Sequence, residues 1–188
     1  QRNIAGMAKL CDDIGIDQRV HTKTHKTPEI AKLQVAAGSR GITCQKLGEA
    51  EAMVDGGLDD ILIPYNIVGK PKLERLVRLA RKARITVSAD SAHTVNGIAE
   101  AASSAGITIP VLVEMDTGAG RCGVQTPAGV TLLAESIDSL AGVEFAGVMT
   151  YPSRRSARAF LDEAVESLAT VGMQARVISG GGPGSESA

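Results

Sequence analysis

Short β-rich apolar runs alternate with longer segments of helical period along the whole chain, and this alternation constrains the fold more than any other feature. The expected strands are Val20–Lys23, Gly41–Gln45, Asp60–Pro64, Ile85–Ala89, Val111–Asp116, Phe145–Tyr151 and Arg176–Ser179. The expected helices are Ile4–Ile14, Pro28–Ala37, Leu47–Gly56, Lys72–Ala83, Ser91–Ala105, Thr126–Leu140 and Arg158–Val171. Seven strands alternating with seven helices predict an α/β fold whose parallel strands are joined by helical crossovers.

Two α/β architectures compete for this pattern. A doubly wound sheet usually carries a Gly-rich fingerprint after its first strand, whereas here the first strand ends in Lys23 and the Gly-rich run comes last. A (β/α)8 TIM-type barrel fits better, because it places its chemistry at the carboxyl ends of the strands and often binds phosphate after the late ones. Such a barrel typically needs about 250 residues, and the chain has 188. We therefore expect one domain over residues 1–188, an incomplete barrel with seven strands visible.

Composition argues against several classes of partner. A net charge of -1, an aromatic content of 2% and the lack of Trp disfavour nucleic acid. No run approaches the length of a transmembrane helix and no leader segment opens the chain, so we expect no membrane association and a cytoplasmic location. The cysteines Cys11, Cys44 and Cys122 lack C-x-x-C spacing, which indicates neither a disulfide framework nor a structural zinc site.

Polar groups follow the expected strands at the end where a barrel has its site. Lys23 closes the first strand, Gln45 the second, Asp90 the fourth and Tyr151 the sixth. A lysine placed there among other cations can act as a Schiff-base nucleophile, and the alternative is a solvated lysine in a basic turn. In an extended strand, His21 would point to the same side as Lys23 and could relay a proton. Lys23 and His21 are therefore the candidate catalytic residues.

Two glycine-rich stretches add candidate contacts to an anion. "SGGGPGS", from Ser179 to Ser185, offers consecutive backbone N–H groups that could cradle a phosphate, or it could be a flexible tail. "DTGAGRCG", from Asp116 to Gly123, sets Arg121 in a tight turn. There its planar charged fork could meet a phenolate, carboxylate or phosphate, or could form a surface ion pair. An amine at the first strand and a phosphate cradle at the seventh could hold the two ends of one ligand.

Five long motifs occur in order along nearly the whole chain: "HTKTHKTPEIAKLQ", "GITCQKLGEAE", "DDILIPYNIVG", "VLVEMDTGAGRCGV" and "SGGGPGS". With these motifs the chain resembles the D-threonine aldolase and D-serine dehydratase family of fold-type III pyridoxal-phosphate enzymes. Members of that family share an alanine racemase-like N-terminal barrel. The resemblance implies that the family's C-terminal β-domain is absent from this chain.

The resemblance also implies a role for individual residues. Lys23 would bind the aldehyde of pyridoxal 5'-phosphate covalently, and Gln45 and Arg121 would contact the ring region of the cofactor. Tyr151 would line the ring. The phosphate would be held by Ser179, Gly180, Gly181 and Gly182.

The activity implied by the resemblance is retro-aldol cleavage of a D-3-hydroxy amino acid, D-threonine or D-3-hydroxyaspartate, to glycine or its analogue plus an aldehyde. The dehydratase branch of the family releases pyruvate and ammonia instead. The family also implies a homodimer and a divalent metal (Mn, Mg or Zn) that binds the β-hydroxyl as a Lewis acid. The family's metal ligands lie in the absent domain, so no metal ligand is placed on this chain. Two further hypotheses are a non-catalytic pyridoxal-phosphate-binding protein and a phosphate-binding barrel enzyme without this cofactor.

Two departures from the family's pattern concern the site. Val20 stands where the family generally has Pro, which restores a backbone donor and leaves the register of Lys23 unchanged. "TYPSRR" replaces the usual Gly- and His-containing segment after the sixth strand, and the connector there is short. The wall of the site that selects the substrate therefore differs at this connector, or residues are missing from it.

Overall fold

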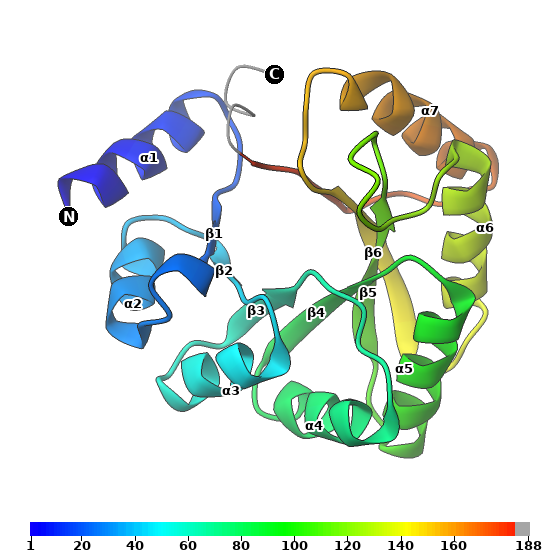
Figure 1. The fold of residues 1–188 in the computed structure, drawn as a ribbon, viewed down its shortest axis with the longest axis horizontal. Helices are drawn as coiled ribbons and strands as arrows, with labels where there is room; N and C mark the ends of the chain where they lie inside the picture. The colour runs from blue at the N-terminus through cyan, green and yellow to red at the C-terminus, as the bar shows by residue number, and fades with distance from the viewer. Residues whose placement is uncertain (183–188) are drawn as a thin grey trace. The chain divides into compact units, whose positions relative to one another are not determined.

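The computed structural model describes residues 1–182, in which strands and helices alternate along the chain (Figure 1). The strands are β1 (Arg19–His21), β2 (Gly41–Thr43), β3 (Asp60–Ile63), β4 (Arg84–Ala89), β5 (Ile109–Met115), β6 (Val143–Thr150) and β7 (Val177–Ser179). The helices are α1 (Arg2–Asp13), α2 (Pro28–Ala36), α3 (Leu47–Asp55), α4 (Lys70–Ala80), α5 (Ala92–Ser104), α6 (Pro127–Asp138) and α7 (Ala157–Thr170). A short 3-10 helix, η1 (Thr22–Thr24), follows β1. Every strand and helix expected from the sequence is confirmed, with ends that differ by a few residues.

The chain divides into two compact units. The N-terminal unit comprises Gln1–Tyr65 and Glu74–Thr86, and the C-terminal unit comprises Asn66–Leu73 and the chain from Val87 onward. The division runs through α4 and β4. Each unit is described below by itself.

In the N-terminal unit, β1, β2 and β3 pair in parallel and in chain order. Arg19 lies opposite Gly41, and Ile42 lies opposite Ile61. All three residues of β2 are buried, because a central parallel strand is covered on both faces. Helix α3 begins directly after this strand and buries Met53 on its inner face.

In the C-terminal unit, β5 pairs in parallel with β4 on one side and with β6 on the other, and β7 pairs with β6. The register between β5 and β6 shifts between Val111 and Leu112, which face Phe145 and Gly147. Helix α6 packs against both of these strands and against its neighbours α5 and α7 (Figure 1). The apolar runs read from the sequence are therefore the buried centre of this unit.

Lys23 lies beyond β1, in η1, so the expectation that it ends the first strand is wrong. The pairing of β1 with β2 stops at His21, and Thr22 then donates its hydroxyl hydrogen to the carbonyl of Thr43 at 3.1 Å. The carbonyl of Thr22 accepts the backbone N–H of Lys26 at 2.8 Å. These bonds close a turn, so alternation along a strand does not place Lys23 and His21 on one side.

Among residues 1–182, no helix combines the length and the apolar character that crossing a membrane requires.

Candidate functional site

The turn that carries Lys23 is organised by the side chain of His21. The Nδ1 atom of His21 accepts the backbone N–H of Lys23 at 3.3 Å, and its Nε2 atom lies 3.3 Å from Oε1 of Gln45. A neutral imidazole with Nδ1 as acceptor carries its proton on Nε2, so Nε2 donates to the Gln45 amide. His21 therefore joins two of the predicted cofactor-binding residues, the lysine and the glutamine.

Burial lowers the pKa of His21 below its ordinary value, and the positive charge of Lys23 lowers it further. The hydrogen bond to Gln45 acts in the opposite direction but is the smaller effect. The imidazole is therefore neutral at neutral pH, which the acceptor role of Nδ1 requires. His21 binds the backbone of the lysine turn, and the proton relay expected from the sequence stays a prediction.

The C-terminal unit brings together the remaining predicted residues. The guanidinium of Arg121 lies 5.2 Å from the ring centroid of Tyr151, a distance at which a cation and an aromatic face attract each other. A Cβ built on Gly182 would lie 3.6 Å from Cε2 of Tyr151, and the φ of this glycine is +130°. The glycine backbone after β7 thus passes beside the aromatic ring, and a side chain at this position would be strained.

The connector after β6 also meets this glycine run. The backbone N–H of Ser153 donates to the carbonyl of Gly181 at 2.7 Å, and a Cβ on Gly180 would lie 3.1 Å from Oγ of Ser153. Ser179 ends β7, and Gly180, Gly181 and Gly182 follow it without regular structure. Pro183, Gly184 and Ser185 of the predicted phosphate loop lie outside the described residues.

The turn that holds Arg121 is fixed by two carboxylates. Oδ1 of Asp116 accepts three backbone N–H groups at 2.8 to 3.1 Å, from Gly118, Ala119 and Gly120. Oδ2 of Asp90 accepts the N–H of Gly123 at 3.1 Å. The hydrogen bond from Gln125, followed by those from the backbone, lowers the pKa of Asp116, so this anchor is ionised at neutral pH.

A buried carboxylate, that of Glu114, lies beneath the same turn. It is 2% exposed, and it accepts hydrogen bonds from Oγ of Ser88 at 3.3 Å and from Sγ of Cys122 at 3.2 Å. Burial raises the pKa of Glu114, whereas its two hydrogen bonds and the charge of Arg121 lower it to a smaller extent. Burial together with Glu114 raises the pKa of Cys122 to about 12, so the thiol stays protonated and donates.

The predicted site residues therefore form two groups, one in each unit. His21, Lys23 and Gln45 lie together in the N-terminal unit. Arg121, Tyr151 and the run from Ser179 to Gly182 lie in the C-terminal unit, where the arginine and Gly182 both approach the tyrosine ring.

Two acidic residues of the site, Glu49 and Glu114, were not singled out from the sequence. Glu49 binds the backbone of Gln45, and Glu114 lies under the turn of Arg121, which also binds the strand-end residue Asp90. A usable signal existed for Glu114 alone, because a charged residue inside the apolar run "VLVEM" must be buried and paired. Glu49 is an acidic residue in the first turn of a helix, which is too common to indicate a site.

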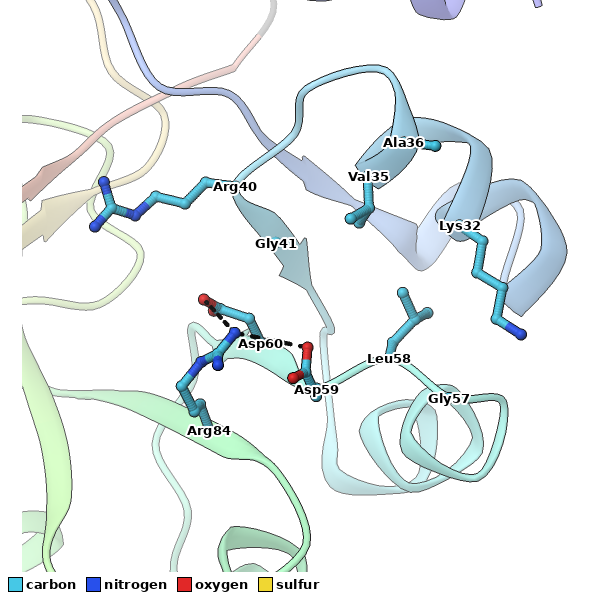
Figure 2. Close-up of a pocket in the computed structure, with 10 residues that line it drawn as sticks. All are labelled: Lys32, Val35, Ala36, Arg40, Gly41, Gly57, Leu58, Asp59, Asp60 and Arg84. Carbon is cyan, nitrogen blue, oxygen red and sulfur yellow. Dashed lines mark ion pairs between the residues drawn. The ribbon is translucent and has the colours of Figure 1, made fainter.

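A pocket of about 320 Å³ in the N-terminal unit lies at the amino ends of the strands, whereas the lysine turn follows the carboxyl end of β1 (Figure 2). Gly41, Asp60 and Arg84, which begin β2, β3 and β4, help to line it. Arg84 pairs there with Asp59 at 3.6 Å and with Asp60 at 3.7 Å (Figure 2). Barrel enzymes place their chemistry at the carboxyl ends of the strands, so this pocket is separate from the lysine turn.

The sequence of this chain matches a family model and two curated aldolases. The family model "Alanine racemase, N-terminal domain" matches residues 1–180. A D-threonine aldolase from an Arthrobacter species is 45% identical over 151 residues, which are 80% of this chain and 40% of that protein. A 3-hydroxy-D-aspartate aldolase from Paracoccus denitrificans (strain Pd 1222) is 35% identical over 201 residues, which are 98% of this chain and 52% of that protein.

A solved structure supports the same assignment. The crystal structure of D-threonine aldolase from Filomicrobium marinum matches with a TM-score of 0.94 and 34% identity, covering 99% of this chain and 54% of that one. This match confirms the barrel class expected from the alternating elements. The chain spans about half the length of the curated relatives it matches, 40% and 52% for the two aldolases. On the extent of the family match and the identity to these relatives, the chain belongs to the alanine racemase N-terminal domain family.

Proposed function

We propose that this chain is the cofactor-binding part of a pyridoxal-phosphate-dependent carbon–carbon lyase that cleaves D-3-hydroxy amino acids by a retro-aldol reaction. The products would be glycine, or its analogue, and an aldehyde. The observation that carries the proposal is the lysine turn, in which His21 links Lys23 to Gln45 in a chain 45% identical to a D-threonine aldolase. Three aldolases among the relatives are 35 to 45% identical to this chain, against 32% for a D-threo-3-hydroxyaspartate dehydratase, and this difference favours carbon–carbon cleavage over dehydration.

The residues present fit pyridoxal 5'-phosphate by their chemistry. The amine of Lys23 would take the aldehyde, and Gln45 and Arg121 would contact the ring region. Tyr151 would line the ring, since its aromatic side chain lies beside both the Arg121 guanidinium and Gly182 of the glycine run. Ser179 and the three glycines after it would hold the phosphate, since a backbone without side chains can approach an anion closely.

When bound, the cofactor supplies an electron sink for the charge that bond cleavage leaves at the α-carbon. The chain's own residues would position that chemistry. His21 holds the backbone of Lys23 with its Nδ1 and the amide of Gln45 with its Nε2–H, so the backbone that carries the amine stays next to the Gln45 amide. Arg121 brings a permanent positive charge. Its turn is held in place by hydrogen bonds from backbone N–H groups to the carboxylates of Asp116 and Asp90.

Several properties of the intact protein belong to the same proposal. A divalent ion, Mn, Mg or Zn, would polarise the β-hydroxyl of the substrate through ligands outside this chain. Within residues 1–182, no group of three or more His, Cys, Asp or Glu side chains has an arrangement suited to a metal ion. A homodimer in the cytoplasm that binds a small D-amino acid, and neither nucleic acid nor membrane, completes the proposal.

A product assay on the full-length protein tests the proposal. D-threonine, D-serine and D-3-hydroxyaspartate are each incubated with the protein loaded with pyridoxal phosphate, with and without Mn, Mg or Zn. Formation of glycine and an aldehyde supports the proposal. Release of ammonia and a keto acid in place of glycine would assign the protein to the dehydratases. A cofactor absorbance band that no substrate shifts would leave only a non-catalytic pyridoxal-phosphate-binding role.

A further inference from the structure

Lys26, the second lysine of "HTKTHK", has an unusual backbone conformation. Its φ is +51°, and among residues 1–182 it is the only residue other than glycine with a positive φ. A non-glycine residue is strained in the left-handed region, so such a conformation persists only where the surroundings enforce it. The feature that accompanies this conformation is an ion pair, in which Nζ of Lys26 lies 3.3 Å from Oε1 of Glu49.

Glu49 makes a second contact with its other oxygen. Oε2 accepts the backbone N–H of Gln45 at 2.9 Å. The side chain is 8% exposed, whereas that of Lys26 is 58% exposed. A buried carboxylate needs both a counter-charge and hydrogen bonds, and Lys26 and Gln45 provide them.

These contacts close a ring around the lysine turn. Gln45 is bound on its backbone by Glu49 and on its side chain by His21. His21 binds the backbone of Lys23, and Lys26, at the other end of the same turn, returns to Glu49. Both ends of the turn are thus fixed to one short segment, the start of α3 and the residue two before it.

We propose that Lys26 and Glu49 are a pair of positioning residues, which hold the turn of Lys23 at a fixed place relative to Gln45. The inference rests on the proposed function, because it assigns the pair a role in presenting the Lys23 amine to the cofactor aldehyde. The pair would act through the backbone of the turn and through Gln45. Breaking the pair leaves both Lys23 and Gln45 present but lets the turn move away from Gln45, which lowers the affinity for pyridoxal phosphate.

The test compares variants of the full-length protein by absorbance titration with pyridoxal phosphate. Glu49→Gln keeps an acceptor for the Gln45 N–H but removes the charge, and Lys26→Met removes the ammonium but keeps the length of the side chain. Each is expected to weaken cofactor binding by about tenfold, the size of one charged hydrogen bond. The double variant is expected to bind no more weakly than either single variant, because both remove the same interaction. Lys26→Arg restores the pair and should bind like the wild type.

Lys9→Met is the matched control. Lys9 forms an ion pair of 2.7 Å with Asp13 in the same unit, but on the exposed surface of α1. This control should leave cofactor affinity unchanged. Urea unfolding of every variant gives the folded fraction under the conditions of the titration. A purely structural role predicts no loss of affinity once the unfolded fraction is taken into account, whereas a positioning role predicts the tenfold loss in fully folded protein.

Borohydride reduction followed by peptide mapping separates the two proposals. If no cofactor is trapped on Lys23 of the wild type, the proposed function fails. If cofactor is trapped there, and Glu49→Gln and Lys26→Met bind it within twofold of the wild type, the positioning role is overturned and the proposed function stands.

Discussion

The thiol of Cys122 donates a hydrogen bond of 3.2 Å to the buried carboxylate of Glu114, and this bond anchors the turn that carries Arg121 from below. Ser88 donates to the other oxygen of the same carboxylate at 3.3 Å. Asp90 and Arg121 are the other charged groups that act on Glu114, and burial outweighs both. Glu114 is therefore a titratable acid, and it lies close to Arg121, the arginine proposed to contact the cofactor.

Glu114→Gln is expected to change how stability depends on pH. Burial raises the pKa of Glu114, so the folded protein holds this proton more tightly than the unfolded chain does. The contribution of Glu114 to the free energy of unfolding therefore falls as pH rises from the ordinary glutamate pKa through the raised one. The variant cannot ionise, so it should gain stability relative to the wild type over a window that begins at about pH 4.5, the ordinary glutamate pKa, and ends where Glu114 ionises in the folded protein. Urea unfolding across this window measures the difference, and parallel curves would contradict it.

Lys23→Ala is expected to abolish covalent attachment of pyridoxal phosphate. The methyl group offers no amine to the aldehyde, and turnover should fall by about three orders of magnitude or more, as for other covalent catalysts. The visible absorbance band of the bound cofactor reports attachment directly. Lys46→Ala, in the segment after β2, is the control for loss of a positive charge near the site. Trapping of the cofactor on another lysine in the wild type would show that the assignment to Lys23 is wrong.

Arg121→Lys is expected to weaken cofactor binding even though the charge is retained. The planar guanidinium approaches the ring of Tyr151 at 5.2 Å, and an ammonium does not reproduce its flat, forked geometry. A loss of about fivefold in affinity corresponds to a cation–π contact of this kind. Tyr151→Phe keeps the aromatic face and serves as the matched variant, while Tyr151→Leu removes it. Isothermal titration with pyridoxal phosphate compares the three, and equal affinities for the Phe and Leu variants would rule out a role for the ring.

His21 is expected to titrate below the ordinary histidine range. Burial, and then the charge of Lys23, favour its neutral form, so the folded pKa lies below the unfolded one. The contribution of neutral His21 to the free energy of unfolding is fully present above the ordinary histidine pKa. This contribution is lost as pH falls from that value through the lower pKa that His21 has in the folded protein. NMR titration of the imidazole signals, assigned with His21→Gln, measures the midpoint. A midpoint at or above about 6.5, the reference value for histidine, would contradict the neutral imidazole.

Gly147→Ala is expected to destabilise the C-terminal unit by about 2–4 kcal/mol, the sum of backbone strain and overpacking. The φ of Gly147 is +143°, and a Cβ there would lie 2.0 Å from the carbonyl oxygen of Val177 in β7. Gly6→Ala is the control, because nothing lies within 4 Å of a Cβ at this helical position. That variant should be neutral or stabilised by about 0.5–1 kcal/mol. Thermal unfolding of both variants provides the comparison.

The sequence alone determined the order of strands and helices, the parallel α/β class and the candidate residues Lys23 and Arg121. These conclusions depend on local periodicity and on the chemistry of motifs, which are properties of adjacent residues. The end of the first strand was misplaced because Val20–Lys23 looks equally extended in sequence, whereas the bond from the Lys26 N–H to the Thr22 carbonyl closes a turn there.

Only the tertiary structure decided which side chains support the candidate site. Glu49 reaches Lys26 and the Gln45 backbone, and Glu114 reaches Ser88 across two neighbouring strands. Such contacts join residues that are far apart in the chain or on different elements, and they depend on strand register and on which face is buried. A buried carboxylate is tolerated only where those partners meet it, so its role follows from packing and not from its position in the sequence.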